Sequence, residues 1–248
     1  MKMINTAKQD NVYKNIIHID FNHVDKTHQD VNIPRVAPID TVSKATVHVN
    51  AKKHHDAQPF KTYDDIQAIS NYFIQHYQFR NNLLFICGIN FGIRISDLLK
   101  LHFSDLIDDN GVIKESFEIL EQKTKSTRKK TKNRIVGIND AVRQALILYL
   151  THNKCSLDDY LFPNESNNAG LYREPLTRKG AEYVIKSVTK TLNIKGRYNT
   201  HSLRKTFGRF YMIKHKDDPQ AIYKLQIIFG HSSPAITKRY IGIEDEEI

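Results

Sequence analysis

Residues 230–240 read Gly-His-Ser-Ser-Pro-Ala-Ile-Thr-Lys-Arg-Tyr, which predicts a sharp turn into a short helix that ends on a tyrosine. Glycine and proline mark the turn, and the helix carries Lys238 and Arg239 immediately before Tyr240. A tyrosine at the end of a helix normally packs against the core, and a histidine in a turn is common. Taken alone, the stretch predicts local structure and no function.

Working outward from this stretch, residues 200–204 read Thr-His-Ser-Leu-Arg and open another helix, with Thr200 or Ser202 placed to cap it. Side chains three residues apart share a helix face, so His201 and Arg204 are expected to project together. Both then lie beside the N–H groups of the first helical turn, which is a favourable place for a phosphate. Two surface residues on a basic helix are the ordinary alternative.

Further upstream, residues 92–99 read Gly-Ile-Arg-Ile-Ser-Asp-Leu-Leu. They follow an apolar segment, about Arg80 to Phe91, which is expected to be a helix that Gly92 terminates. Another short helix is expected from Ile95 to Leu101. Arg94 therefore lies in a turn between two helices.

The densest charge lies in residues 121–134, Glu-Gln-Lys-Thr-Lys-Ser-Thr-Arg-Lys-Lys-Thr-Lys-Asn-Arg, with seven cations and one anion between two strand-like segments. Such a loop repels itself and gains order beside an anion, so it indicates a loop that docks on phosphates; a solvated hairpin is the alternative. It would contact a nucleic-acid backbone without reading bases. The DNA-binding residues expected in it are Lys125, Arg128, Lys129, Lys130 and Lys132.

Periodicity and capping signals predict a mainly α-helical fold with a small antiparallel β-sheet. The Thr-x-x-Asp signal at residues 62–65 starts the first clear helix. Turn and strand patterns occupy residues 105–138. The remaining helices are expected at residues 140–151, 177–193, 200–215, 219–229 and 234–240.

Residues 1–59 differ from the rest, because they hold six of the twelve histidines, no glutamate and no helical period. We interpret them as a basic, mostly extended arm, and residues 60–248 as the folded domain. The histidines have no cysteine partners and no metal-ligand spacing, so no metal site is expected.

Composition narrows the class of protein. The 37 Lys and Arg outnumber the 27 Asp and Glu, and the net charge of +10 favours a polyanionic partner. With two cysteines, no secretory signal and no apolar run of membrane-spanning length, the chain is expected to be cytoplasmic.

The order and spacing of these segments resemble the tyrosine recombinase (phage integrase) family. The likeness covers about Phe60 to Ile243 and rests on four separated motifs together with the helix–hairpin–helix pattern around them. It implies the mainly helical recombinase catalytic domain with its small antiparallel sheet. Residues 1–59 are shorter than the helical core-binding domain usual in the family, and the acidic tail after Tyr240 is short for exchange between protomers.

The resemblance also implies a catalytic set, which is Arg94, Lys123, His201, Arg204, His231 and Tyr240. In the family's chemistry two arginines neutralise the non-bridging phosphate oxygens, and the tyrosine forms a 3′-phosphotyrosyl bond. A histidine takes the phenol proton, a second histidine bonds the phosphate and a hairpin lysine protonates the leaving 5′-oxygen. Lys125 is the alternative to Lys123 as that acid. No cofactor, metal or ATP is implied, because bond energy stays in the phosphotyrosine.

The function expected is site-specific DNA recombination or integration by a tyrosine-type recombinase from a mobile element. The partners implied are double-stranded DNA, further copies of the chain in a homotetramer on paired sites, and an accessory DNA-binding protein; a membrane is not among them. Two alternatives are a type IB topoisomerase-like activity and a non-catalytic DNA-binding accessory protein with the same fold.

Overall fold

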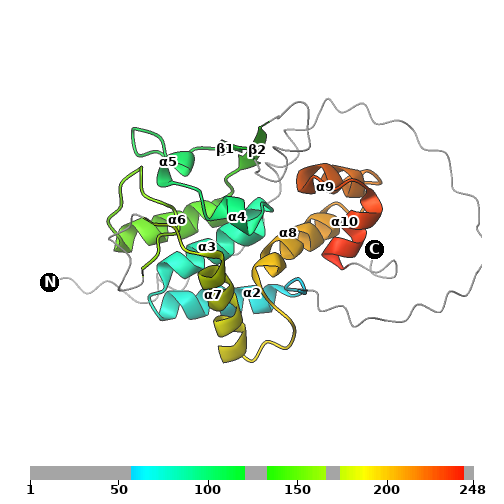
Figure 1. The fold of residues 1–248 in the computed structure, drawn as a ribbon, viewed down its shortest axis with the longest axis horizontal. Helices are drawn as coiled ribbons and strands as arrows, with labels where there is room; N and C mark the ends of the chain where they lie inside the picture. The colour runs from blue at the N-terminus through cyan, green and yellow to red at the C-terminus, as the bar shows by residue number, and fades with distance from the viewer. Residues whose placement is uncertain (1–56, 121–132, 166–173, 243–248) are drawn as a thin grey trace, which may run out of the picture.

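The computed structural model describes residues 57–120, 133–165 and 174–242 (Figure 1). Helices dominate these ranges, and a two-stranded sheet lies at one edge of the helical body. None of the helices in the described ranges has both the length and the apolar character needed to cross a membrane. The predicted class, mainly α with a small antiparallel sheet, is confirmed.

The first helix begins where the Thr-x-x-Asp signal predicts. In α2 (Tyr63–Gln75) the Thr62 hydroxyl accepts a hydrogen bond from the Asp65 N–H at 3.1 Å. Just before it, Phe60 is fully buried and its N–H donates to Thr206 Oγ1 at 2.9 Å. The chain is therefore anchored to the core before α2 begins.

The next helix, α3 (Phe79–Phe91), is the centre of the fold (Figure 1). Its residues are buried on nearly all sides, which explains why its sequence is apolar without a clear helical period. It packs against α2, α6 (Asp140–His152) and α8 (Thr200–Lys214). Gly92 ends it in the left-handed conformation, as predicted.

Two short helices follow, and here the prediction needs correction. The helix expected over residues 95–101 is shorter, α4 (Ile95–Leu98), and a second one, α5 (Phe103–Leu106), was not predicted. In α5 the carboxylate of Asp105 accepts the His102 N–H at 2.8 Å as part of a capping box. A four-residue helix is too short to show a hydrophobic period.

The sheet consists of β1 (Ser116–Ile119) and β2 (Arg134–Gly137), paired antiparallel so that Ile119 faces Arg134. Phe117 and Val136 are its buried pair. Both strands lie within the segment predicted to be strand and turn.

The later helices match the predicted segments closely. They are α6, α7 (Arg178–Thr191), α8, α9 (Ala221–Phe229) and α10 (Pro234–Ile241). The start of α9 comes two residues after the predicted Pro219, because residues 219–220 form a turn. Helices α9 and α10 pack on α8 and on each other.

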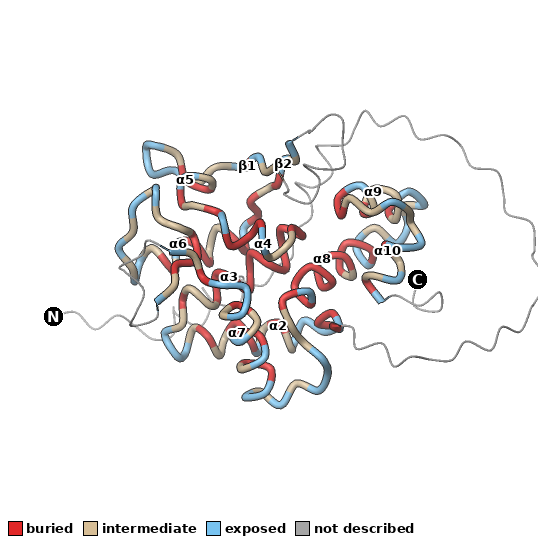
Figure 2. Tube along the Cα trace, in the orientation of Figure 1, coloured by how far each residue is buried: buried red, intermediate tan, exposed pale blue. Residues whose placement is uncertain are grey.

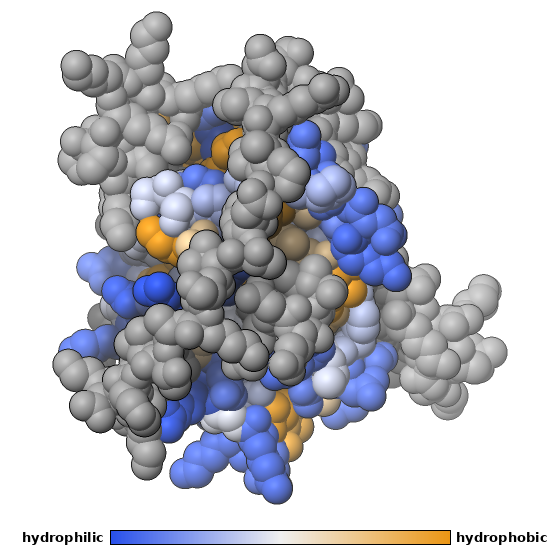
Figure 3. All heavy atoms as spheres, turned by 90° about the vertical axis from the view of Figure 1, so that its right-hand side faces the viewer, coloured by the Kyte–Doolittle hydropathy of each residue, from blue (hydrophilic) through white to orange (hydrophobic). Residues whose placement is uncertain are grey.

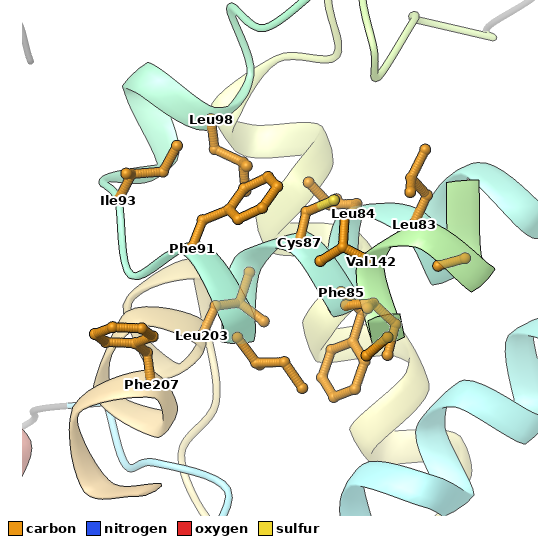
Figure 4. Close-up of a cluster of buried hydrophobic side chains, with 14 of the residues drawn as sticks. Leu83, Leu84, Phe85, Cys87, Phe91, Ile93, Leu98, Val142, Leu203 and Phe207 are labelled. Atoms are coloured by element: carbon orange, nitrogen blue, oxygen red, sulfur yellow. The ribbon is translucent and has the colours of Figure 1, made fainter. Parts of the chain in front are cut away.

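Buried residues concentrate along α3 and α8, in the middle of the helical body (Figure 2). In Figure 4, Leu203 and Phe207 of α8 lie beside the end of α3 and the turn that follows it. A Cβ atom on Gly92 would lie 2.5 Å from Phe207 Cδ1, and φ at this residue is +58°. Close packing and backbone conformation therefore both require glycine at position 92, two residues before Arg94.

Candidate active site

The last carbonyl of α9 is the meeting point of two predicted arginines. Nη2 of Arg204 donates to the Phe229 carbonyl oxygen at 2.8 Å, and Nη2 of Arg94 donates to the same oxygen at 3.3 Å. Arg204 is buried in α8, whereas Arg94 is the half-buried N-cap residue of α4. Carbonyl groups at a helix C-terminus carry partial negative charge, so they are suited to hold two cations.

The ring of Phe229 gathers the other members of the site. The guanidinium carbon of Arg204 lies 4.4 Å from the ring centre. The rings of His231 and Tyr240 meet the Phe229 ring edge-on, with centroids 5.4 Å and 5.5 Å away, and their own centroids are 5.2 Å apart. Four of the predicted residues therefore converge on one phenylalanine.

The phenol of Tyr240 is held in its protonated form. Burial raises its pKa above the usual value of 10, and the positive charges of Arg204 and Arg94 oppose part of that shift. The two arginines are thus close enough to act on the phenol electrostatically. A tyrosine in this setting is neutral at physiological pH and needs a base before it can act as a nucleophile.

Local capping brings Tyr240 to this position. The C-terminal turn of α9 closes at Gly230, in the left-handed conformation, and the His231 N–H donates back to the Gln226 carbonyl at 3.0 Å. The next helix, α10, starts at Pro234, as the sequence predicts, and Ser233 is its N-cap. This tight turn allows one short helix to return Tyr240 to the end of α9.

The ring of His231, in the turn between α9 and α10, has a fixed partner in α10. Its Nδ1 lies 3.0 Å from the Thr237 hydroxyl, and that hydroxyl donates to the Ser233 carbonyl at 3.4 Å. A hydroxyl that donates elsewhere is left to accept, which favours the tautomer with its proton on Nδ1. The orientation of His231 is therefore set by α10 itself.

A lysine that the sequence did not single out lies against the candidate nucleophile. Lys205 is 6% exposed, and its Nζ is 5.3 Å from the centre of the Tyr240 ring. Such an ammonium group over an aromatic face is attractive, and more so when it is shielded from water.

His201 occupies a different environment from Arg204, although both belong to α8. It is exposed, and its Nε2 lies 3.3 Å from Nη2 of Arg178 at the start of α7. A guanidinium can only donate, so Nε2 of His201 is the acceptor if this contact is a hydrogen bond. A neutral imidazole is the form that can take up a proton.

The expected cap of α8 needs correction. Asn199 is the N-cap, and its side-chain oxygen accepts the His201 N–H at 2.8 Å. The Ser202 hydroxyl completes a capping box by accepting the Asn199 N–H at 3.1 Å. Thr200 is buried and is the first residue of the helix. Asparagine is as good a cap as serine or threonine, so the sequence alone did not decide between them.

The predicted lysines and arginine of the basic loop, namely Lys123, Lys125, Arg128, Lys129, Lys130 and Lys132, lie outside the described residues. The last residue of the basic stretch, Arg134, is described and belongs to β2. Its Nη2 donates to the Phe91 carbonyl at 2.7 Å and its Nη1 to the Ile228 carbonyl at 3.3 Å. The start of β2 therefore contacts the ends of both α3 and α9.

Figure 3 views the molecule from the side of α9 and α10, and the described atoms visible there are mostly hydrophilic, with hydrophobic areas between them. This surface suits a polar partner. The functional contacts that sequence reasoning missed are the carbonyl and ring of Phe229, the ammonium of Lys205 and the guanidiniums of Arg134 and Arg178. A backbone carbonyl leaves no signature in a sequence, and the charged residues were indistinguishable from the other cations of a basic chain.

Residues 60–247 match the model of the phage integrase family. The chain is 33% identical over 192 residues to the protein named "Probable integrase/recombinase YoeC" of Bacillus subtilis. The matched residues cover 77% of this chain and 93% of YoeC. It spans about half the length of several other curated tyrosine recombinases that it matches.

Solved structures agree with the fold. XerA recombinase has a TM-score of 0.54 at 22% identity, covering 77% of this chain and 63% of XerA. XerH recombinase, solved on its palindromic difH substrate after cleavage, has a TM-score of 0.53 at 17% identity, covering 77% of this chain and 51% of XerH. These structures share the fold, and the matched family model and the 33% identity to YoeC show that this chain is a member of the phage integrase family of tyrosine recombinases.

Proposed function

We propose that the chain is a site-specific DNA recombinase that cuts and rejoins DNA strands through a 3′-phosphotyrosine at Tyr240. The observation that carries the proposal is that Arg94 and Arg204 both donate to the carbonyl of Phe229. The ring of the same residue packs against Tyr240. Two guanidiniums beside a buried phenol suit a reaction in which negative charge grows on phosphate oxygens while a tyrosine attacks phosphorus.

In the proposed reaction, the Tyr240 oxygen forms a bond to phosphorus and the bond from phosphorus to the 5′-oxygen breaks. The phenol proton passes to His201, whose Nε2 is an acceptor in its contact with Arg178. Arg94 and Arg204 stabilise the non-bridging oxygens, and His231 adds a hydrogen bond. The departing 5′-oxygen takes a proton from Lys123, or from Lys125 in its place. Neither a metal nor ATP enters this scheme.

Rejoining is the same reaction in reverse, with a 5′-hydroxyl from the same or another strand as the nucleophile. We propose a homotetramer on paired sites, with an accessory DNA-binding protein as a further partner, acting in the cytoplasm. The net charge of +10 and the complex of XerH with its DNA substrate support double-stranded DNA as the ligand. We further propose that residues 60–248 form the catalytic domain and residues 1–59 an arm.

Nicked suicide DNA, which traps the covalent intermediate, tests the proposal on a denaturing gel. Wild type is expected to form a covalent adduct, and Tyr240→Phe is expected to form none while binding DNA within a few-fold of wild type. An adduct retained by Tyr240→Phe would disprove the assignment, and Tyr223→Phe would then be tested. Relaxation of supercoiled DNA without exchange between two sites would instead indicate topoisomerase-like activity, and DNA binding without any adduct would indicate an accessory protein.

A further inference from the structure

Arg134 joins two helix ends that lie far apart in the sequence. Its two terminal nitrogens donate to the Phe91 carbonyl at 2.7 Å and to the Ile228 carbonyl at 3.3 Å, with a longer contact of 3.5 Å to the Gly92 carbonyl. These carbonyls end α3 and α9, where a helix leaves acceptors without partners of its own. A guanidinium has a planar fork of donors, so one side chain can serve both ends at once.

Each of the joined helix ends carries part of the candidate active site. The end of α3 continues through Gly92 and Ile93 directly into Arg94. At the end of α9, the Phe229 carbonyl accepts from both Arg94 and Arg204. It follows directly on the Ile228 carbonyl that Arg134 contacts. The distance between these two helix ends therefore sets where the arginine pair points.

The strand gives Arg134 a fixed direction. Residues alternate between the two faces of a strand, so Arg134 shares the face of Val136, which is buried, while Ile135 between them is exposed. Backbone pairing with Ile119 holds the start of β2 in register. Arg134 is thus aimed into the protein, unlike a cation placed to meet DNA from the surface.

We infer that Arg134 is a positioning residue for the proposed recombinase reaction, because it sets the spacing of the α3 and α9 ends and through them the orientation of Arg94 and Arg204. The inference rests on the proposed function. It separates Arg134 from the loop cations that were expected to bind phosphates directly, which are Lys125, Arg128, Lys129, Lys130 and Lys132.

The informative substitution is Arg134→Lys, because it keeps the charge and loses the fork that bridges two carbonyls. Arg143→Lys is the matched control. Arg143 is also half-buried and also donates to two carbonyls near the hairpin, those of Ile113 and Lys114 at 3.1 Å and 2.9 Å, but these carry no part of the site. Comparing the two variants removes the general effect of losing a buried guanidinium.

Single-turnover cleavage of suicide DNA is expected to slow about 10²-fold in Arg134→Lys, as for displacement of reacting groups by about 1 Å. DNA affinity and its salt dependence should stay within a few-fold of wild type, because the charge is kept. Arg143→Lys should cleave at nearly the wild-type rate per folded molecule. Equal slowing in both variants, or a fall in melting temperature with an unchanged rate per folded molecule, would overturn the inference.

A substrate with sulfur at the bridging 5′ position shows which part of the reaction Arg134 serves. Its thiolate leaves without needing a proton, whereas the charge on the non-bridging oxygens is the same as in ordinary DNA. Arg134→Lys should remain slow on this substrate, since the arginine pair is still misplaced. Rescue to the wild-type rate would mean that Arg134 acts on the leaving group through the hairpin, and the inference would be wrong.

A measurement without DNA separates the inference from the proposed function. In Arg134→Lys, the side-chain Nε–H signals of Arg94 and Arg204 in ¹⁵N NMR spectra should shift and exchange faster with water, while Arg143→Lys leaves them unchanged. If wild type forms no adduct, the proposed function fails and these spectra still decide whether Arg134 positions the pair. Unchanged signals in Arg134→Lys would overturn the inference.

Discussion

Gly208→Ala tests whether the packing of α10 on α8 determines the position of Tyr240. A Cβ atom on Gly208 would lie 2.5 Å from Ile241 Cγ2, and also 3.0 Å from Phe229 Cζ. Ordinary contact begins at 3.4 Å, so the added methyl group must push Ile241 away by about 0.9 Å. Tyr240 precedes Ile241 in the same helix and is expected to move with it.

Two effects on stability oppose each other in this variant. Alanine in place of glycine within a helix stabilises by about 1 kcal/mol, whereas overpacking a core costs about 1–3 kcal/mol. The net loss is expected to be about 0–2 kcal/mol, so the variant should fold. A displacement of about 1 Å at Tyr240, the proposed nucleophile, is expected to slow the single-turnover formation of the covalent adduct about 10²-fold.

Single-turnover cleavage of suicide DNA, chemical denaturation and DNA binding measure these quantities on the same preparation. Gly208→Ala combined with Ile241→Ala is the matched control, because it removes the methyl group that the new Cβ meets and should recover part of the rate. A folded Gly208→Ala variant that cleaves within twofold of wild type would refute the idea that this contact positions Tyr240.

Three further predictions concern the chemistry and the DNA contacts. Arg204→Ala is expected to lower the cleavage rate by about 10²–10³-fold with a much smaller loss of binding, and an unchanged rate per folded molecule would contradict its role. In His201→Ala the rate of adduct formation should rise with pH up to and beyond 10. Without the histidine the Tyr240 phenol, whose pKa is raised by burial, must lose its proton to hydroxide. A rate independent of pH would contradict His201 as the base. Replacement of Arg128, Lys129 and Lys130 by glutamine should lower the slope of log affinity against log salt concentration by about 0.9 for each lost phosphate contact. An unchanged slope would mean that the loop does not contact DNA.

Much of the fold could be predicted, because its long helices carry explicit start and stop signals. Thr62 caps α2, Gly92 ends α3, and Pro234 starts α10, each where the sequence indicates. The four-residue helices α4 and α5 were misjudged or missed, since so short a helix shows no period and depends on local capping.

The candidate site was predictable only as a set of side chains. The resemblance to the tyrosine recombinase family implied Arg94, Arg204, His231 and Tyr240, which the structure brings together. How they are held could not be predicted, because the shared acceptor is the backbone of Phe229 and backbone groups are the same at every position.

That shared acceptor has a consequence for genetic studies of this protein. Every amino acid that could replace Phe229 keeps the carbonyl oxygen that Arg94 and Arg204 share. A saturation-mutagenesis survey would therefore report position 229 as a hydrophobic site and register only the loss of its ring. The oxygen becomes visible to experiment through protein semisynthesis, in which an ester linkage between residues 229 and 230 weakens this acceptor and leaves every side chain in place. The ester also removes the Gly230 N–H, which donates to the Ile227 carbonyl at 3.0 Å, so the loss of that hydrogen bond is measured separately.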